Sequence, residues 1–151
     1  MSGQYNTVHV KVNKTHSRIV LPRYESDGAS GLDLKAFIEN NITIPPLGRE
    51  KVPTGLRIEL PQGFEAQIRP RSGLAFKKGL TVLNSPGTID SDYRGEIEVI
   101  LVNLSPENII IKDGDRIAQL VVSAVCRVSL EETDDLSVTG RGSGGFGSTG
   151  A

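Results

Sequence analysis

Hydrophobic and polar residues alternate along short stretches of this chain. In LRIEL, residues 56–60, the three apolar residues fall on one face of an extended strand and the two charged residues fall on the other. The stretch FEAQIR, residues 64–69, repeats the pattern. A period of two residues predicts strands with one buried face and one solvated face.

Other short apolar or β-branched runs predict further strands. These are VHVKV (8–12), RIVLP (18–22), NITI (41–44), LTVLN (80–84), EIEVILVN (96–103), IIIK (109–112) and RIAQLVVSAVCRV (116–128). The two long runs, 96–103 and 116–128, are predicted to be the more deeply buried. Turn-forming residues separate the runs: Pro45-Pro46, Pro61 with Gly63, Pro86-Gly87, Ser105-Pro106 and Asp113-Gly114. Only residues 72–79 are compatible with a short helical turn.

Many short strands separated by turns predict an all-β fold, a jelly-roll-like antiparallel barrel or sandwich. A chain of 151 residues suits one domain, which buries roughly two-thirds of its surface on folding. The acidic run EETDD (131–135) and the glycine-rich RGSGGFGSTG (141–150) depart from core composition. We therefore predict a β-rich domain over residues 1–130 and a flexible C-terminal arm over residues 131–151.

Charge and cysteine content narrow the function classes. The chain has 17 basic and 18 acidic residues and a net charge of -1, so we expect no stable nucleic-acid binding. Cys126 is the single cysteine, which excludes an internal disulfide and, with only His9 and His16 beside it, makes a zinc site poorly supplied. No apolar run is long enough to span a bilayer, and the N-terminus lacks a signal-peptide core. We expect a cytoplasmic protein with no membrane association.

Four internal segments contain more polar and glycine residues than simple turns require. They are GASGLDLKA (28–36), PRSGLA (70–75), NSPGTIDSDYRGE (84–96) and DGDRIAQL (113–120). Each alone also fits an ordinary structural interpretation. In order, these are a loop that enters a strand with Asp33 solvated, a helical cap begun by Ser72, a hairpin tip, and a tight turn before a buried strand.

The C-terminal end matches G-x-G-x-x-G at Gly142, Gly144 and Gly147. No strand directly precedes the match and too little chain follows it for a helix, so it is not a dinucleotide-binding fingerprint. A glycine-rich arm can instead wrap an anion with its backbone N–H groups, with Arg141 as a charged fork and Phe146 as a flat lid. A disordered tail is the plain alternative.

Taken in order, ASGLDLKA, PRSGLA, GTIDSDYRG, GDRIAQL and RGSGGFGSTG resemble the five motifs of the homotrimeric dUTP pyrophosphatase (dUTPase) family. The resemblance extends from Ala29 to Gly150. It implies hydrolysis of dUTP to dUMP and pyrophosphate by attack of water on the α-phosphorus, which keeps uracil out of DNA and supplies dUMP for thymidylate synthesis. It also implies Mg²⁺ held by the triphosphate, a homotrimer with sites at subunit interfaces, and an arm that closes over the nucleotide.

The resemblance assigns Asp90 as the general base. It places Asn84 and the backbone from Gly87 through Ile89 to Tyr93 around the uracil, and it lays the Tyr93 ring against the deoxyribose. The structural alternatives are a turn-forming role for Asp90 and cross-strand packing for Tyr93.

Three residues near these positions have weaker assignments. Pro86 has no backbone N–H, so it is expected to donate no hydrogen bond to the base. Ser91 and Arg94 are expected only to shape the turn.

On the phosphate side, the resemblance places Arg71, Ser72, Gly73 and Gln119 around the triphosphate. It places Asp33 in the outer shell of the metal, reached through water, so no direct protein ligand is expected. The arm is implied to add further substrate contacts, with Arg141, Gly147, Ser148 and Thr149 at the phosphate end and Phe146 stacked on uracil.

Two other functions remain open from the sequence. The related dCTP deaminases would need a site that accepts cytosine, and the complete glycine-rich arm together with GTIDSDYRG favours dUTPase instead. A catalytically silent relative that binds nucleotide or a protein partner as a regulator is the second alternative.

Overall fold

The computed structural model describes residues 7–145 and is built from antiparallel β-strands. The strands are β1 (Lys11–Lys14), β2 (Leu32–Lys35), β3 (Ile42–Ile44), β4 (Arg49–Pro53), β5 (Leu56–Glu59), β6 (Phe64–Arg69), β7 (Leu80–Val82), β8 (Gly87–Ile89), β9 (Glu98–Asn103), β10 (Ile109–Ile111) and β11 (Arg116–Ala124). One short helix, α1 (Ser72–Lys78), lies between β6 and β7. The predicted all-β fold is confirmed.

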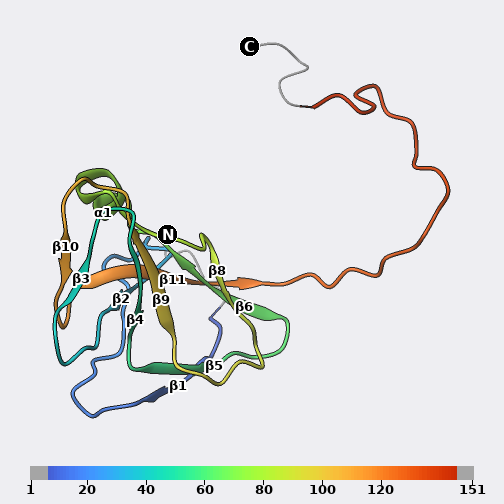
Figure 1. Ribbon diagram of the computed structural model, residues 1–151. Coiled ribbons are helices and arrows are strands. Elements are labelled where there is room, and N and C mark those ends of the chain that lie inside the picture. The colour runs from blue at the N-terminus through green and yellow to red at the C-terminus, as the bar shows by residue number, and fades with distance from the viewer. Residues whose placement is uncertain (1–6, 146–151) are drawn as a thin grey trace.

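The strands form four small sheets. β2, β11, β6 and β8 make one sheet in that order, and β4, β9 and β7 make a second. β1 pairs with β5, and β10 pairs with β3. Figure 1 shows these sheets gathered into one body, while the chain after β11 leaves it as an extended segment. Within residues 7–145, no helix has the length and apolar character needed to cross a membrane.

The core combines apolar side chains from both larger sheets with others from β3, β5 and β10, because the period-two pattern directs alternate residues of each strand inward. Its largest fully buried side chains are Leu34, Ile44, Ile97, Leu101, Ile117, Val52, Val99 and Asn103. Full burial of one aliphatic side chain contributes roughly 1.5–3 kcal/mol. Every residue of β9 is buried or half-buried, and β11 is exposed only at its two ends, so the predicted deep burial of these two strands is confirmed.

Several predicted boundaries are wrong. Residues 18–22 form no strand, and β11 ends at Ala124, after which residues 125–128 are exposed. β4 and β8 were not predicted as strands, because β4 contains three exposed charged residues and β8 has only three residues. Four of the five predicted turns lie between strands, while in the fifth, Pro86-Gly87, the glycine is already the first residue of β8.

The helix also begins differently from the prediction. Arg71, and not Ser72, is the N-cap residue, and its side chain makes no capping hydrogen bond. The helix ends at Lys78 and is capped by Gly79, whose φ of 63° lies in the left-handed region that favours glycine. Its last turn contains Lys77 and Lys78. Their positive charges interact favourably with the negative end of the helix dipole.

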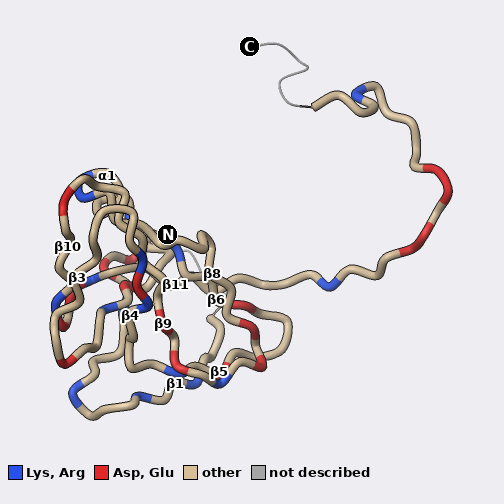
Figure 2. Tube along the Cα trace, viewed as in Figure 1, with Lys and Arg blue, Asp and Glu red and all other residues tan. Residues whose placement is uncertain are grey.

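Charges of both signs are interspersed over the strands, as Figure 2 shows. The acidic run 131–135 lies on the extended C-terminal segment, away from the strands (Figure 2).

Candidate active site

A cavity of about 250 Å³ lies between β8 and β9. It contains five of the residues singled out in the sequence: Asn84, Gly87, Ile89, Asp90 and Tyr93. The remaining lining residues are Lys51, Ile68, Thr88, Glu96, Glu98, Val99 and Ile100. The structure therefore brings together, in one concave site, the residues expected around a nucleoside.

Segment 84–96 crosses between the two larger sheets, which makes this cavity. β7 pairs with β9 in one sheet, but β8 pairs with β6 in the other, with Gly87 opposite Ile68 and Ile89 opposite Ala66. The segment is therefore not the simple hairpin tip considered from the sequence. Because it leaves one sheet and returns to it, it encloses a space with apolar walls from β6 and β9.

Gly87 has little room for a side chain. A Cβ atom there would lie 3.2 Å from Asn84 Nδ2 and 3.3 Å from Ile68 Cβ. A larger residue would therefore push Asn84 or the strand β6 aside. This close packing explains a glycine at the start of β8 without any need for a positive φ.

A turn carries Asp90 and Tyr93. The N–H of Tyr93 donates to the carbonyl of Asp90 at 3.1 Å, and the Tyr93 hydroxyl donates to the carbonyl of Glu96 at 3.1 Å. Gly95 lies directly against the Tyr93 ring, because a Cβ at Gly95 would collide with the ring and its hydroxyl. The Tyr93 ring is thus fixed at one edge of the cavity, with 43% of the residue exposed.

Three charged residues of the cavity were missed from the sequence. Lys51 Nζ lies 2.8 Å from Glu98 Oε2, and this hydrogen bond raises the pKa of Lys51 above its ordinary value, so the ammonium stays charged. Glu96 accepts the N–H of Gly55 at 2.7 Å. Lys51 on β4 and Glu98 on β9 lie on paired strands. The two residues were missed because β4 was not predicted as a strand.

A second cluster forms around Asp33, where β2, β6 and β11 lie side by side. Asp33 Oδ1 lies 3.3 Å from Arg71 Nε, and Asp33 Oδ2 lies 3.1 Å from Arg116 Nη1. The Asp33 side chain is only 16% exposed, so the solvated Asp33 considered from the sequence is wrong, although the loop does enter a strand, β2. Arg71 also donates to the carbonyl of Arg116 at 3.2 Å. Arg116 was not predicted, since nothing in its neighbours indicates that β11 pairs with β2.

Gln119 belongs to the same cluster. It lies opposite Asp33 on β2 and opposite Arg69 on β6, and its Nε2 donates to the carbonyl of Pro70 at 2.9 Å. Ser72 and Gly73 are exposed in the first turn of α1, where backbone N–H groups have no partner within the helix. This cluster combines two guanidinium groups, an amide and free N–H groups, a set suited to bind phosphate.

The two groups of residues occupy different places on one chain. None of Asp33, Arg71 and Gln119 lines the 250 Å³ cavity. A larger cavity of about 360 Å³ is lined by Asp33 and by residues of the 18–25 segment, but by no other predicted site residue. The smaller cavity is therefore the one that gathers the residues expected around a nucleoside.

The C-terminal segment lies away from both groups in this structure (Figure 1). Arg141 is exposed, and its Nε donates to the carbonyl of Gly144 at 2.8 Å. Gly142 has a φ of 51° in the same local turn. The predicted contacts of Phe146, Gly147, Ser148 and Thr149 lie outside the described residues. Within residues 7–145, no three His, Cys, Asp or Glu side chains gather to hold a metal ion.

The family model for dUTPase matches residues 17–150 of the chain. The chain is 61% identical over 130 residues to the deoxyuridine 5'-triphosphate nucleotidohydrolase of Neorickettsia sennetsu, covering 86% of this chain and 87% of the relative. It is 56% identical over 148 residues to the protein of that name from Wolinella succinogenes, covering 98% of each.

Solved structures agree on the fold. The dUTPase of Staphylococcus bacteriophage 80alpha, solved with dUpNHpp, matches with a TM-score of 0.82 at 22% identity, covering 96% of this chain and all of that one. A mutant dUTPase from phage phi11 of S. aureus, described with a structural Mg(II) ion, matches with a TM-score of 0.77 at 17% identity and covers 86% of this chain and 99% of that one.

Proposed function

Because this chain belongs to the dUTPase family and is a dUTP diphosphatase, we propose that the cavity between β8 and β9 receives deoxyuridine and that Asp90 is the general base. The observation that carries the proposal is the gathering of Asn84, Gly87, Ile89, Asp90 and Tyr93 around one cavity. The reaction converts dUTP to dUMP and pyrophosphate. It keeps uracil out of DNA and supplies dUMP for thymidylate synthesis.

Uracil recognition rests on groups with fixed polarity. The Asn84 amide offers both a donor and an acceptor, so alone it cannot distinguish uracil from cytosine. The backbone of β8 is held in register by its pairing with β6, so its N–H and C=O groups cannot reverse. The wrong base would leave buried polar groups of such a site without hydrogen-bond partners. This penalty discriminates against the wrong base by about 10⁴-fold.

Tyr93 selects the sugar. Its ring is fixed between Gly95 and the hydrogen bond to Glu96. A ring lying against the deoxyribose leaves no room for a ribose 2′-hydroxyl. Because Tyr93 cannot withdraw toward Gly95, the clash with a ribose is not relieved by a small movement.

Asp90 accepts the proton of the attacking water. The water oxygen bonds to the α-phosphorus, the bond from this phosphorus to the bridging oxygen breaks, and pyrophosphate leaves. Asp90 lies at the start of the turn that carries Tyr93, so the base and the sugar-selecting ring are positioned by the same four residues. Such a general base contributes roughly 10²–10⁴-fold to the rate.

The cluster around Asp33 binds the triphosphate. Arg71 and Gln119 donate to phosphate oxygens, together with the first-turn N–H groups of Ser72 and Gly73. Arg116 is an additional cation in this cluster. A triphosphate that enters the site competes with Asp33 for Arg71. The cation that accompanies the nucleotide then balances the negative charge of Asp33.

Mg²⁺ fits this cluster as a cation carried by the triphosphate. Asp33 already shares its two oxygens between Arg71 and Arg116, so it would hold the ion through water and not as a direct ligand. When bound, Mg²⁺ neutralises charge on the phosphate oxygens that develops during the transfer.

The complete site requires more than one chain. The nucleoside cavity and the triphosphate cluster share no lining residue among those the structure describes, which supports sites assembled at the subunit interfaces of a homotrimer. Residues 1–130 are the proposed β-rich domain, and its strands, from Lys11 to Ala124, form the body of each subunit. The arm, residues 131–151, closes over bound nucleotide, with Arg141, Gly147, Ser148 and Thr149 at the phosphates and Phe146 on the uracil.

The cellular setting follows from the substrate. dUTP is formed where other deoxynucleotides are formed, so we place the protein in the cytoplasm. An exposed free thiol, that of Cys126, fits a reducing compartment.

The purified protein is incubated with Mg²⁺ and, separately, with dUTP, dCTP, dTTP and UTP, while proton release is followed and products are identified. We expect rapid conversion of dUTP alone, to dUMP and pyrophosphate. Ammonia released from dCTP would assign the site to the deaminase reaction. No product from any nucleotide, with dUTP still bound, would favour the regulator.

A further inference from the structure

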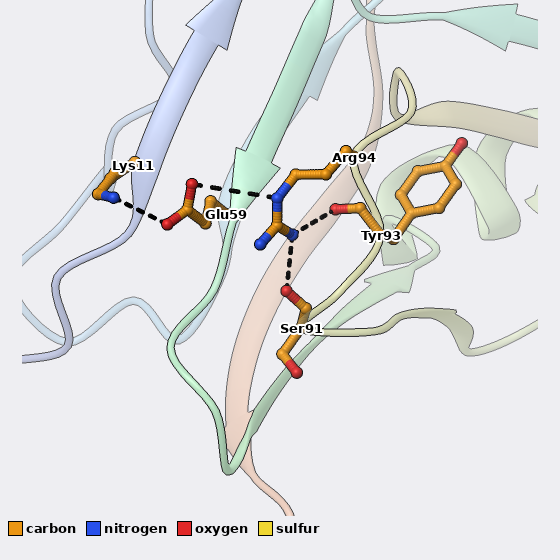
Figure 3. Close-up of polar contacts among 5 residues, drawn as sticks. All are labelled: Lys11, Glu59, Ser91, Tyr93 and Arg94. Atoms are coloured by element: carbon orange, nitrogen blue, oxygen red, sulfur yellow. Dashed lines mark hydrogen bonds and ion pairs between the residues drawn. The ribbon is translucent and has the colours of Figure 1, made fainter.

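Arg94 connects the turn at Asp90 and Tyr93 to a different sheet. Its Nη1 donates to the carbonyl of Ser91 at 2.7 Å and to the carbonyl of Tyr93 at 2.9 Å. Its Nε lies 4.0 Å from Glu59 Oε2, at the end of β5. Figure 3 shows the guanidinium between the two carbonyls and the Glu59 carboxylate, with the Tyr93 ring pointing away from it.

The two carbonyls belong to one turn. The N–H of Tyr93 donates to the carbonyl of Asp90, so residues 90–93 form a closed turn, and Arg94 donates to two of the four carbonyls of these residues. A charged donor makes stronger hydrogen bonds than a neutral one. These two bonds limit rotation of the Ser91–Asp92 and Tyr93–Arg94 peptide planes, and rotation of these planes would redirect the side chains of Asp90 and Tyr93.

The far end of the contact is also fixed. Glu59 Oε1 accepts from Lys11 Nζ at 2.8 Å, and Lys11 lies directly opposite Glu59 in the pairing of β1 with β5. The hydrogen bond from Lys11 lowers the pKa of Glu59, so the carboxylate stays ionised near neutral pH. Lys11, Glu59 and Arg94 thus form a chain of charges that ends at the turn (Figure 3).

We propose that Arg94 is a positioning residue for dUTP hydrolysis, which orients Asp90 and Tyr93 through the carbonyls of Ser91 and Tyr93 and is itself anchored by Glu59. The inference rests on the proposed roles of Asp90 and Tyr93. Arg94 does not line the nucleoside cavity, so it acts through the turn and not through the substrate.

The positioning role of Arg94 can be separated from the stability of the domain. The side chains of Arg94, Glu59 and Lys11 are 54%, 43% and 82% exposed, and exposed ion pairs contribute little to stability. The fold around the turn is secured by other contacts, including the hydrogen bond from Gly55 to Glu96 and the pairing of β8 with β6. Loss of Arg94 should therefore loosen the turn without unfolding the domain.

The test compares Arg94→Gln and Arg94→Lys with Arg57→Gln. Arg57 is an exposed arginine two residues before Glu59 on the same face of β5 and lies outside this network. We expect Arg94→Gln to lower kcat for dUTP by roughly ten- to a hundredfold, with a smaller change in KM and an unchanged melting temperature. Its preference for dUTP over UTP should fall, because Tyr93 moves with Asp90. Arg94→Lys should recover part of kcat, and Arg57→Gln should resemble the parent.

Two further variants make every result decisive. Parent-like kcat and parent-like sugar preference in Arg94→Gln overturn the inference. If that variant does not fold, Glu59→Gln replaces it, with an expected two- to fivefold loss of kcat, about the size of an exposed ion-pair effect, and no loss overturns the inference. Asp90→Asn is measured in parallel. An active Asp90→Asn contradicts the proposed function itself, whereas an inactive Asp90→Asn beside a fully active Arg94→Gln contradicts only the role of Arg94.

Discussion

Gly31 lies directly against the side chain of Gln119. A Cβ atom at Gly31 would collide with Gln119 Oε1 and would lie 3.2 Å from Gln119 Cβ. Gln119 also donates to the carbonyl of Pro70, so its amide is fixed from two sides beside Arg71 and Asp33. A glycine in the first motif therefore keeps the proposed phosphate-binding amide of the fourth motif in position.

Gly31→Ala is predicted to raise KM for dUTP about tenfold, which is the effect of losing one hydrogen bond to a charged group. The new methyl group meets the flexible end of Gln119, so the amide moves and the fold remains. The matched control is Gly28→Ala, because a Cβ at Gly28 has no neighbour within 4 Å and both changes restrict the unfolded chain equally. Equal KM values for the two variants would remove Gln119 from the substrate site.

Gly95→Ala is predicted to weaken sugar discrimination. Its methyl group would overlap the Tyr93 ring, with Cε2 only 2.9 Å away, so the ring must move and the hydroxyl must leave Glu96. The ratio of kcat/KM for dUTP to that for UTP should fall by about tenfold or more. Tyr93→Phe keeps the ring and should keep most of the ratio. A parent-like ratio in Gly95→Ala would show that the ring does not select the sugar.

Lys11→Met is predicted to raise the pKa of Glu59 toward its ordinary value of 4.5, because both the hydrogen bond and the charge of Lys11 are lost. Arg94→Gln should raise this pKa less, since Arg94 is the weaker influence. A depressed folded-state pKa means that the stabilising contribution of Glu59 is present above its unfolded pKa and is lost as pH falls through the folded pKa. NMR titration of the Glu59 carboxyl carbon measures both shifts, and an unchanged pKa in Lys11→Met would contradict the pairing.

The fold class was predictable because the strands with the clearest period-two pattern, such as Leu56–Glu59 and Phe64–Arg69, form the sheets. The local hydrophobic pattern does not predict a strand whose formation depends on the strand that pairs with it. The run 18–22 is apolar yet forms no strand, while Arg49–Pro53 becomes a strand because β9 lies beside it. Strand pairing is a tertiary interaction, so the local sequence pattern does not reveal it.

The site was predictable to the extent that its residues lie in contiguous motifs. Asp90 and Tyr93 were found because they share one stretch with Gly87 and Ile89. Lys51, Glu98 and Arg116 were not found, because each reaches its partner only through strand pairing. Arg94 was visible in the same motif as Asp90, but its two carbonyl partners and Glu59 emerge only from the folded turn.

The most direct test of the account compares Asp90→Asn with Asp92→Asn. Asp92 is an exposed carboxylate in the same turn that does not line the cavity, so it controls for loss of charge. The measurement is the single-turnover rate of dUTP hydrolysis, with the dissociation constant of dUpNHpp determined for each variant. The account predicts that Asp90→Asn binds dUpNHpp like the parent but hydrolyses dUTP at least about a hundredfold more slowly, while Asp92→Asn remains active. Near-normal turnover in Asp90→Asn would remove Asp90 from the mechanism and contradict the account.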